Sequence, residues 1–168
     1  MQIFQGSLYL KYKKQLLLCA FIGLLAYGIS DQCFQFLMIQ GESMYPSYHN
    51  YQITILDKRC RDFQRGDVIA FQCEGFRSLL VKRIAAVPHD TVKIVNGALY
   101  VNNELSDKAL LRGCIEDAGI AQETVVLLEN EYFVLGDYYE KSKDSRHKKI
   151  GRVKRSSIIG RVLPHVDG

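Results

Sequence analysis

The sequence predicts a mostly β protein with one N-terminal transmembrane helix. Three observations support this prediction: an uncharged apolar run near the N-terminus, a series of short strand-like runs after residue 40, and the lack of a long helical-period stretch there apart from residues 105–121. The 168 residues are enough for one domain with a hydrophobic core. We therefore expect a single β-rich domain on a membrane anchor.

The N-terminal run begins after a basic cluster, Lys11, Lys13 and Lys14, and contains no charge from residue 16 to residue 30. A membrane span needs about 20 apolar residues, so this run is short for one. The lysines favour a cytoplasmic N-terminus. There are three alternatives to a membrane span for this run: a cleaved signal peptide, a buried soluble helix, and a helix that lies in the membrane interface.

These features divide the chain into three predicted segments. Residues 1–14 are expected in the cytoplasm, residues 15–32 in the membrane, and residues 33–168 outside it as the β-rich catalytic domain. Several apolar residues directly after the span are expected to extend its contact with the bilayer interface: Phe34, Phe36, Leu37, Met38 and Ile39.

The β-rich body is predicted from short runs of Val, Ile, Leu, Tyr and Phe that are often separated by turn residues. These runs are residues 51–56, 68–73, 79–87, 91–95, 98–102, 124–128, 132–135 and 158–163. The clearest hairpin joins two of them through Asn96-Gly97, which suits a type I′ turn because both central residues need a positive φ. Residues 103–123 show no clear strand and are expected to form a variable or flexible loop.

The composition excludes some functions and leaves others open. The content is 48% apolar and 24% charged, as in globular proteins, and a net charge of +4 does not by itself indicate nucleic-acid binding. Residues 141–155 include nine basic side chains. This segment has three possible interpretations: a solvated basic face, a nucleic-acid surface, or a surface that contacts anionic lipid headgroups. The predicted topology favours lipid over nucleic acid.

The five cysteines are an odd number and include no Cys-x-x-Cys pair, so we expect no metal site and no cofactor. A bridge between Cys60 and Cys73 is possible in an oxidising compartment, but the sequence does not define its geometry.

Four segments and a closing Gly-Arg resemble, in order, the motif boxes of bacterial type I signal peptidases, in their compact Gram-positive form. They are Gly41-Glu-Ser-Met-Tyr-Pro-Ser47, Arg65-Gly-Asp-Val-Ile-Ala-Phe71, Val81-Lys-Arg-Ile-Ala-Ala-Val-Pro88, Tyr132-Phe-Val-Leu-Gly-Asp-Tyr-Tyr-Glu-Lys-Ser-Lys-Asp-Ser-Arg146 and Ile159-Gly-Arg161. The resemblance implies a signal-peptidase-like β-sheet domain. It also implies a membrane-bound serine endopeptidase that removes signal peptides from exported preproteins after small residues, as in Ala-x-Ala sites.

By this resemblance Ser43 is the nucleophile and Lys82 its general base. A lysine is almost fully protonated at neutral pH, with a pKa near 10.4, unless burial disfavours its ammonium form. Strand alternation places Lys82 with apolar neighbours on one face and points Arg83 the other way, towards solvent. The simpler readings are a surface lysine and a turn serine.

The resemblance implies further site residues. The backbone N–H of Ser43 serves the oxyanion, with Gly41 allowing close approach, and Ser142 hydrogen-bonds and orients the lysine. Asp137, Asp144 and Arg146 are expected to hold the region together through an ion pair. The full set of expected structural residues near the site is Met44, Pro46, Arg83, Gly136, Asp137, Asp144, Ser145 and Arg146.

The sequence departs from the family pattern at several positions. Ser47 replaces a threonine and keeps a hydroxyl, while His89 replaces a glycine, so the turn there loses a permissive residue. Other unusual residues stand at 138, 139 and 147–149.

Two other functional classes compete with the Ser-Lys enzyme. A Ser-His-Asp hydrolase would have to recruit one of four histidines, His49, His89, His147 or His165, although Tyr45 breaks the Gly-x-Ser-x-Gly pattern. A membrane-tethered binding or assembly factor for secreted proteins, with little or no catalysis, is the non-enzymatic alternative.

Overall fold

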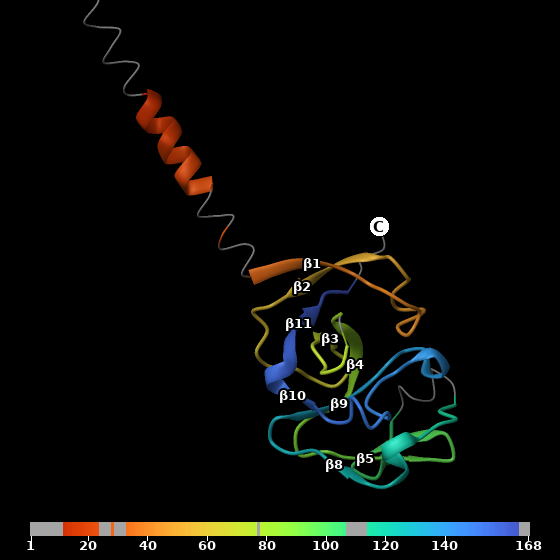
Figure 1. The fold of residues 1–168 in the computed structure, drawn as a ribbon. Helices are drawn as coiled ribbons and strands as arrows, with labels where there is room; N and C mark the ends of the chain where they lie inside the picture. Colours follow the sequence, from red (N-terminus) through yellow and green to blue (C-terminus); the bar gives the residue numbers. More distant parts are fainter. Residues whose placement is uncertain (1–11, 24–27, 29–32, 77, 107–113, 165–168) are drawn as a thin grey trace, which may run out of the picture.

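Two antiparallel β-sheets form the body of the computed structural model (Figure 1), which describes residues 12–23, 28, 33–76, 78–106 and 114–164. The larger sheet has seven strands in the order β1-β2-β11-β3-β4-β9-β10. Its strands are β1 (Phe34–Met38), β2 (Ile53–Asp57), β3 (Val68–Phe71), β4 (Leu80–Ala86), β9 (Glu131–Leu135), β10 (Val153–Lys154) and β11 (Ile158–Val162).

The smaller sheet has four strands in the order β7-β6-β5-β8. They are β5 (Thr91–Val95), β6 (Ala98–Val101), β7 (Glu104–Leu105) and β8 (Val125–Val126). Asn96 and Gly97, between β5 and β6, have φ values of 50° and 78°, so the predicted turn with two positive φ angles is confirmed.

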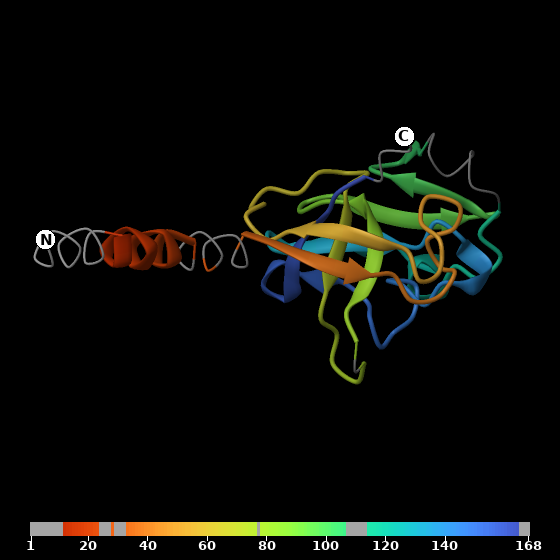
Figure 2. The same cartoon turned by 90° about the horizontal axis from the view of Figure 1, so that it is seen from above.

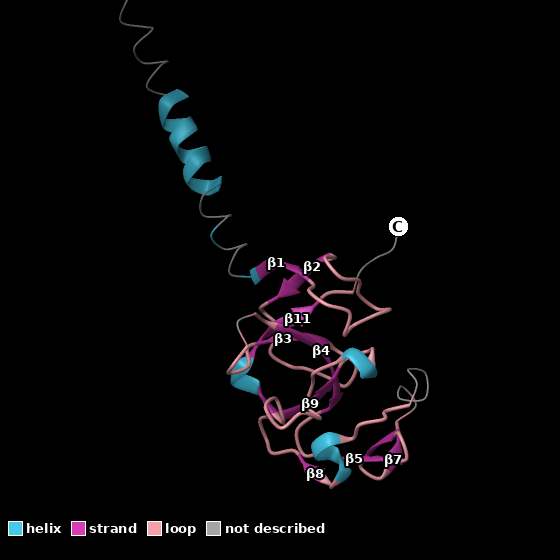
Figure 3. Ribbon diagram, turned by 45° about the vertical axis from the view of Figure 1, so that its right-hand side comes forward, coloured by secondary structure: helices cyan, strands magenta, loops and turns pink. Residues whose placement is uncertain are grey.

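Among the described residues from 34 to 164, helical structure is limited to three short 3₁₀ turns, η1 (Gly119–Gln122), η2 (Tyr139–Lys141) and η3 (Arg155–Ser157). Figure 3 shows how strands and long loops make up the rest. The predicted mostly β fold class is therefore confirmed. Of the possible helical stretch at 105–121, residues 107–113 lie outside the described residues, and the others include only the start of η1.

Apolar side chains join the two sheets. Val92 and Leu99 of the small sheet pack in one buried cluster with Phe133 and Leu135 of β9. A second buried cluster includes Phe71, Ile84 and Val134, which belong to three strands of the large sheet. Strand β4 contributes buried residues to both clusters. This packing fixes the position of the strand that carries Lys82.

All eight runs predicted as strands contain strands, with ends that differ by at most two residues. The sequence analysis missed β1, β7 and β10. The prediction that residues 103–123 lack strands is wrong at β7, a two-residue strand. Residues 34–38, expected to contact the bilayer interface, form strand β1 and pair with β2, with Phe36 opposite Ile55 and Met38 opposite Ile53.

The N-terminal segment is helical over residues 12–23, and all of these residues are exposed. In Figure 2 this helix lies apart from the two sheets. Among the described residues, no helix is both long enough and apolar enough to cross a membrane. The predicted span at 15–32 falls partly outside the described residues, at 24–27 and 29–32, and so do residues 1–11 of the predicted cytoplasmic segment.

Candidate active site

Ser43 and Lys82 lie in contact, although they come from different parts of the fold. Ser43 belongs to a turn-rich loop between β1 and β2, called here the nucleophile loop (residues 41–50), and Lys82 belongs to β4. The Nζ atom of Lys82 donates a hydrogen bond of 2.6 Å to Oγ of Ser43. This distance is within the reach that a base needs to accept a proton from a hydroxyl.

Lys82 is 4% exposed, and burial alternates along β4 as predicted, with Lys82, Ile84 and Ala86 on the buried side. Burial lowers the pKa of Lys82 to about 8, because a low-dielectric surrounding disfavours the ammonium form; Asp144 raises the pKa and Arg146 lowers it. The amine is therefore partly neutral near physiological pH, as a general base requires.

The nucleophile loop is anchored by the side chain that follows the serine. Met44 is 1% exposed and packs in a buried cluster with Ile39 and Leu56. Gly41 has a φ of +90°, a conformation that favours glycine, and its N–H donates to Oδ1 of Asn50 at 2.8 Å. Pro46, which follows a cis peptide bond, is exposed in the same loop.

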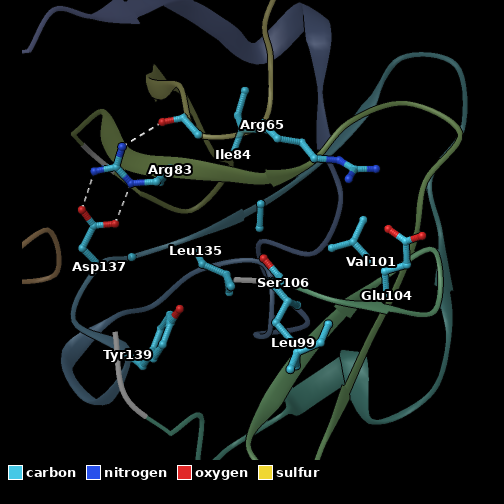
Figure 4. A pocket seen from close by; sticks show the side chains of 14 residues that line it. Arg65, Arg83, Ile84, Leu99, Val101, Glu104, Ser106, Leu135, Asp137 and Tyr139 are labelled. Carbon is cyan, nitrogen blue, oxygen red and sulfur yellow. Dashed lines mark hydrogen bonds and ion pairs between the residues drawn. The ribbon is translucent and has the colours of Figure 1, made fainter. Parts of the chain in front are cut away.

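Arg83 does not face solvent, and this expectation from strand alternation is wrong. Its guanidinium donates to both carboxylate oxygens of Asp137, at 2.9 and 2.6 Å, and to the carbonyl of Gly66 at 2.8 Å (Figure 4). The hydroxyl of Ser47 donates to the same carboxylate at 2.5 Å. The carboxylate of Asp137 is 1% exposed, and its pairing with Arg83 explains why the arginine side chain turns inward. Because Arg83 and Ser47 both bond this carboxylate, it connects β4 to the nucleophile loop.

A second buried ion pair orders the loop that follows β9. Asp144 is fully buried and accepts from Nε of Arg146 at 2.8 Å and from the N–H of Gly136 at 3.1 Å. Arg146 also donates to the carbonyls of Tyr139 and Ser142. The expected ion pair is thus formed by Asp144 and Arg146, whereas Asp137 pairs with Arg83.

Ser145 connects the same loop to β9. Its side chain is fully buried, its Oγ accepts a hydrogen bond from the N–H of Val134 at 2.9 Å, and its own N–H donates to the carbonyl of Val134 at 3.0 Å. This pair of bonds fixes where the loop passes the large sheet.

Gly136 lies where three parts of the site converge. A Cβ added there would lie 2.2 Å from Oγ of Ser142 and 2.5 Å from the carbonyl oxygen of Ser43, closer than real Cβ atoms approach. That carbonyl also accepts the N–H of Tyr138 at 3.0 Å. Only glycine therefore lets the segment after β9 pack against the nucleophile loop.

Ser142 is near the serine but does not bond the lysine. Its side chain is 5% exposed, and its Oγ has no hydrogen-bond partner among the described residues. The hydrogen bond to Lys82 expected from the resemblance is therefore not formed in this structure, where the amine is directed at Ser43.

A groove of about 410 Å³ runs past Ser43 and Lys82. Its lining is continuous from β1 through the nucleophile loop to the start of β4 and to Lys141 and Lys143. A second cavity, of about 290 Å³, lies between the sheets next to the Arg83–Asp137 pair and contains neither Ser43 nor Lys82 (Figure 4). No cluster of three or more His, Cys, Asp and Glu side chains able to hold a metal occurs in the described part of the chain.

Three further points bear on the sequence predictions. His49 stacks edge-on against Tyr45, and within the described residues no histidine hydrogen-bonds Ser43; His165 lies outside them.

All five cysteines are free, so a Cys60–Cys73 bridge is not formed. The sequence reasoning missed the roles of Ser47, which bonds Asp137, and of the Glu42–Lys141 ion pair. The only signal for Ser47 was its retained hydroxyl.

A serine hydroxyl and a desolvated lysine amine in one groove are typical of serine hydrolases that use a lysine as base. Comparison with known sequences gives the family. The chain matches the family described as signal peptidase, peptidase S26, over residues 12–166.

Signal peptidase I S of Bacillus subtilis is 30% identical over 162 residues, which cover 90% of this chain and 85% of that protein. Signal peptidase I P of Bacillus subtilis subsp. natto is 28% identical over 147 residues, covering 82% and 79%. A crystal structure of a signal peptidase I from Enterococcus faecalis V583 is 30% identical and covers 61% of this chain and 97% of that one, with a TM-score of 0.47. The chain belongs to the signal peptidase family, peptidase S26, and is a hydrolase of the serine-protease class.

Proposed function

We propose that this protein removes N-terminal signal peptides from exported preproteins, with Ser43 as nucleophile and Lys82 as general base. The observation that carries the proposal is the 2.6 Å contact between the hydroxyl of Ser43 and an amine that is 4% exposed. Burial lowers the pKa of Lys82 to about 8 and so increases the neutral fraction of the amine that can act as a base.

The reaction has two steps. Neutral Lys82 takes the proton of the Ser43 hydroxyl as Oγ attacks the scissile carbonyl; the proton then passes to the leaving amine, and the signal peptide stays bound to Ser43 as an ester. In the second step Lys82 takes a proton from water, whose oxygen attacks the ester carbonyl. The proton returns to Oγ of Ser43, and the carboxylic acid leaves.

Charge on the tetrahedral intermediate needs donors that are already in place. We assign this role to the backbone N–H of Ser43. Gly41 leaves open space beside it, because a Cβ there would meet nothing within 4 Å. We assign Ser142 to orienting Lys82 once substrate fills the groove, since its buried hydroxyl has no other partner among the described residues.

The groove supports a preference for small apolar residues before the cut. Its wall at the end of β1 and the start of β4 includes apolar side chains such as Leu37, Ile39, Leu79 and Val81. An extended substrate lying along this wall can add main-chain hydrogen bonds in the manner of an extra strand. This arrangement fits cleavage at Ala-x-Ala sites.

We further propose that the protein is tethered to a lipid bilayer by its N-terminal segment, with the catalytic domain outside the cytoplasm. Four apolar side chains gather on the outer face of β1 and β2, here called the β1–β2 face: Phe36 (78% exposed), Met38, Ile53 and Ile55. An exposed apolar patch next to a groove is typical of a surface that contacts membrane or protein. Bilayer contact would hold the groove beside membrane-embedded substrates.

The proposal is tested by cleavage of a preprotein in detergent. We expect Ser43→Ala and Lys82→Ala each to lower kcat by several orders of magnitude, as in coupled catalytic pairs. Lys93→Ala, on the exposed side of β5, is the matched control and should cut normally. Unchanged cleavage by Lys82→Ala would rule out the dyad, and a Ser43→Ala protein that still supports secretion in cells would favour the binding-factor alternative.

A further inference from the structure

The charged side chains that line the groove are unevenly balanced. They are Glu42, Lys82, Lys141 and Lys143. Lys82 is neutral when it acts as a base, and Glu42 pairs with Lys141 at 2.5 Å. Lys143 forms no ion pair within the described part of the chain. When Lys82 is neutral, the groove therefore holds one uncompensated positive charge, that of Lys143.

The Glu42–Lys141 pair joins the two loops that flank the serine. Glu42 directly precedes Ser43, and Lys141 directly precedes Ser142, so the ion pair links the two loops beside the nucleophile. Lys141 also lies over the ring of Tyr138, with Nζ 5.4 Å from the ring centroid. Because both side chains are more than half exposed, the pair is weak and leaves Lys141 accessible to incoming charges.

The lining of the groove therefore contains two kinds of residue. Those from β1 and the start of β4 are mostly apolar, whereas Lys141 and Lys143 contribute basic side chains, here called the lysine wall. Lys141 lies beside the nucleophile, because its partner Glu42 directly precedes Ser43. A peptide that is cut at Ser43 therefore passes close to this basic part of the lining.

We propose that the lysine wall makes this enzyme select preproteins that carry an acidic side chain within the first few residues after the scissile bond. The inference rests on the proposed function, whose substrate class it narrows. An aspartate there gains a favourable interaction with Lys143, and a lysine there is repelled; both effects weaken as salt screens exposed charges.

The test uses fluorogenic peptides that are identical before the cut and carry Asp, Asn or Lys after it. For wild type at low ionic strength we expect kcat/KM for the Asp peptide to exceed that for the Lys peptide by roughly fivefold, the scale of an exposed charge pair. High salt should bring the ratio towards one. Lys143→Glu should reverse the preference, and Glu42→Gln should increase it, because it leaves Lys141 unpaired.

Lys148→Glu is the control for net charge, since Lys148 is exposed outside the groove lining, and it should keep the wild-type ratio. Equal cleavage of the Asp and Lys peptides by wild type, or an unchanged ratio in Lys143→Glu, would overturn the inference about the lysine wall. Cleavage of the Asn peptide in the same assay would still support the proposed function. No cleavage of any peptide, and none of a full preprotein, would overturn both.

Discussion

Lys82 and Ser43 are 39 positions apart in the chain, yet their side chains form a hydrogen bond of 2.6 Å. The contact depends on β4 for the buried amine and on Met44 for the position of the hydroxyl, because Met44 fixes the nucleophile loop in the core. The same burial that brings the amine to the serine also lowers the pKa of the amine. Position and basicity therefore have one structural cause.

The first prediction concerns the pH dependence of cleavage. Since Lys82 must be neutral to accept a proton and its pKa is about 8, kcat/KM should rise with pH and level off above about 8. The measurement is a pH–rate profile on a neutral peptide. A profile that is flat from pH 6 to 9 would contradict a titrating lysine base.

The second prediction concerns stability. A folded-state pKa of about 8, below the ordinary lysine value of 10.5, means that the unfolded state binds the proton more tightly. The buried amine therefore destabilises the folded state fully below pH 8, and the penalty fades as pH rises from about 8 to 10.5. Lys82→Met should raise the free energy of unfolding at pH 7 by on the order of 2–3 kcal/mol.

Chemical denaturation at pH 7 and near pH 10 measures this gain, which should shrink at the higher pH. Lys93→Met, at an exposed position of β5, is the control and should show no such pH-dependent gain. A gain of equal size at both pH values would mean that better packing, and not the lost charge, stabilises the variant.

The third prediction separates a catalytic from a structural role for Ser142. Its hydroxyl is buried without a partner among the described residues, so Ser142→Ala should leave the free energy of unfolding unchanged or slightly higher. If the hydroxyl orients Lys82 in the substrate complex, kcat should still fall by roughly 10- to 100-fold, the range of a lost hydrogen bond in the transition state. Loss of stability together with normal kcat would contradict this role.

Much of this site was predictable because motif order and strand alternation are local features of the sequence. Alternation along β4 correctly placed Lys82 on the buried side, and the Asn96-Gly97 turn followed from backbone preference alone. Arg83 was misplaced because its partner, Asp137, lies 54 positions away, and alternation cannot reveal a buried carboxylate on a neighbouring segment. Strand β1 was missed because Phe36 and Met38, which are exposed on it, make its sequence resemble a continuation of the apolar run.

The fourth prediction follows from a departure in sequence. His89 has a φ of 70°, so a residue with a Cβ occupies a left-handed conformation at an exposed turn. This conformation costs about 1–2 kcal/mol for such residues. His89→Gly should remove that cost and, after the greater loss of backbone freedom by glycine, stabilise the protein by roughly 0.5–1 kcal/mol.

Thermal unfolding measures this as a rise in Tm of about 1–4 °C. His89→Ala keeps the Cβ and should give no gain, which separates backbone strain from any effect of the imidazole. A Tm for His89→Gly at or below that of His89→Ala would contradict the explanation.

The last prediction tests whether the β1–β2 face contacts lipid. The chain contains no tryptophan, so Phe36→Trp introduces a single indole at a position that is 78% exposed. In the full chain reconstituted with vesicles, its emission should shift to shorter wavelength and be quenched by brominated lipids, because indole rings favour the membrane–water interface. Val126→Trp, at a 54% exposed site on β8 of the smaller sheet, is the control and should remain in water. Equal emission and quenching at the two positions would show that the β1–β2 face does not rest on the bilayer, and its exposed apolar side chains would then have to serve contact with another protein.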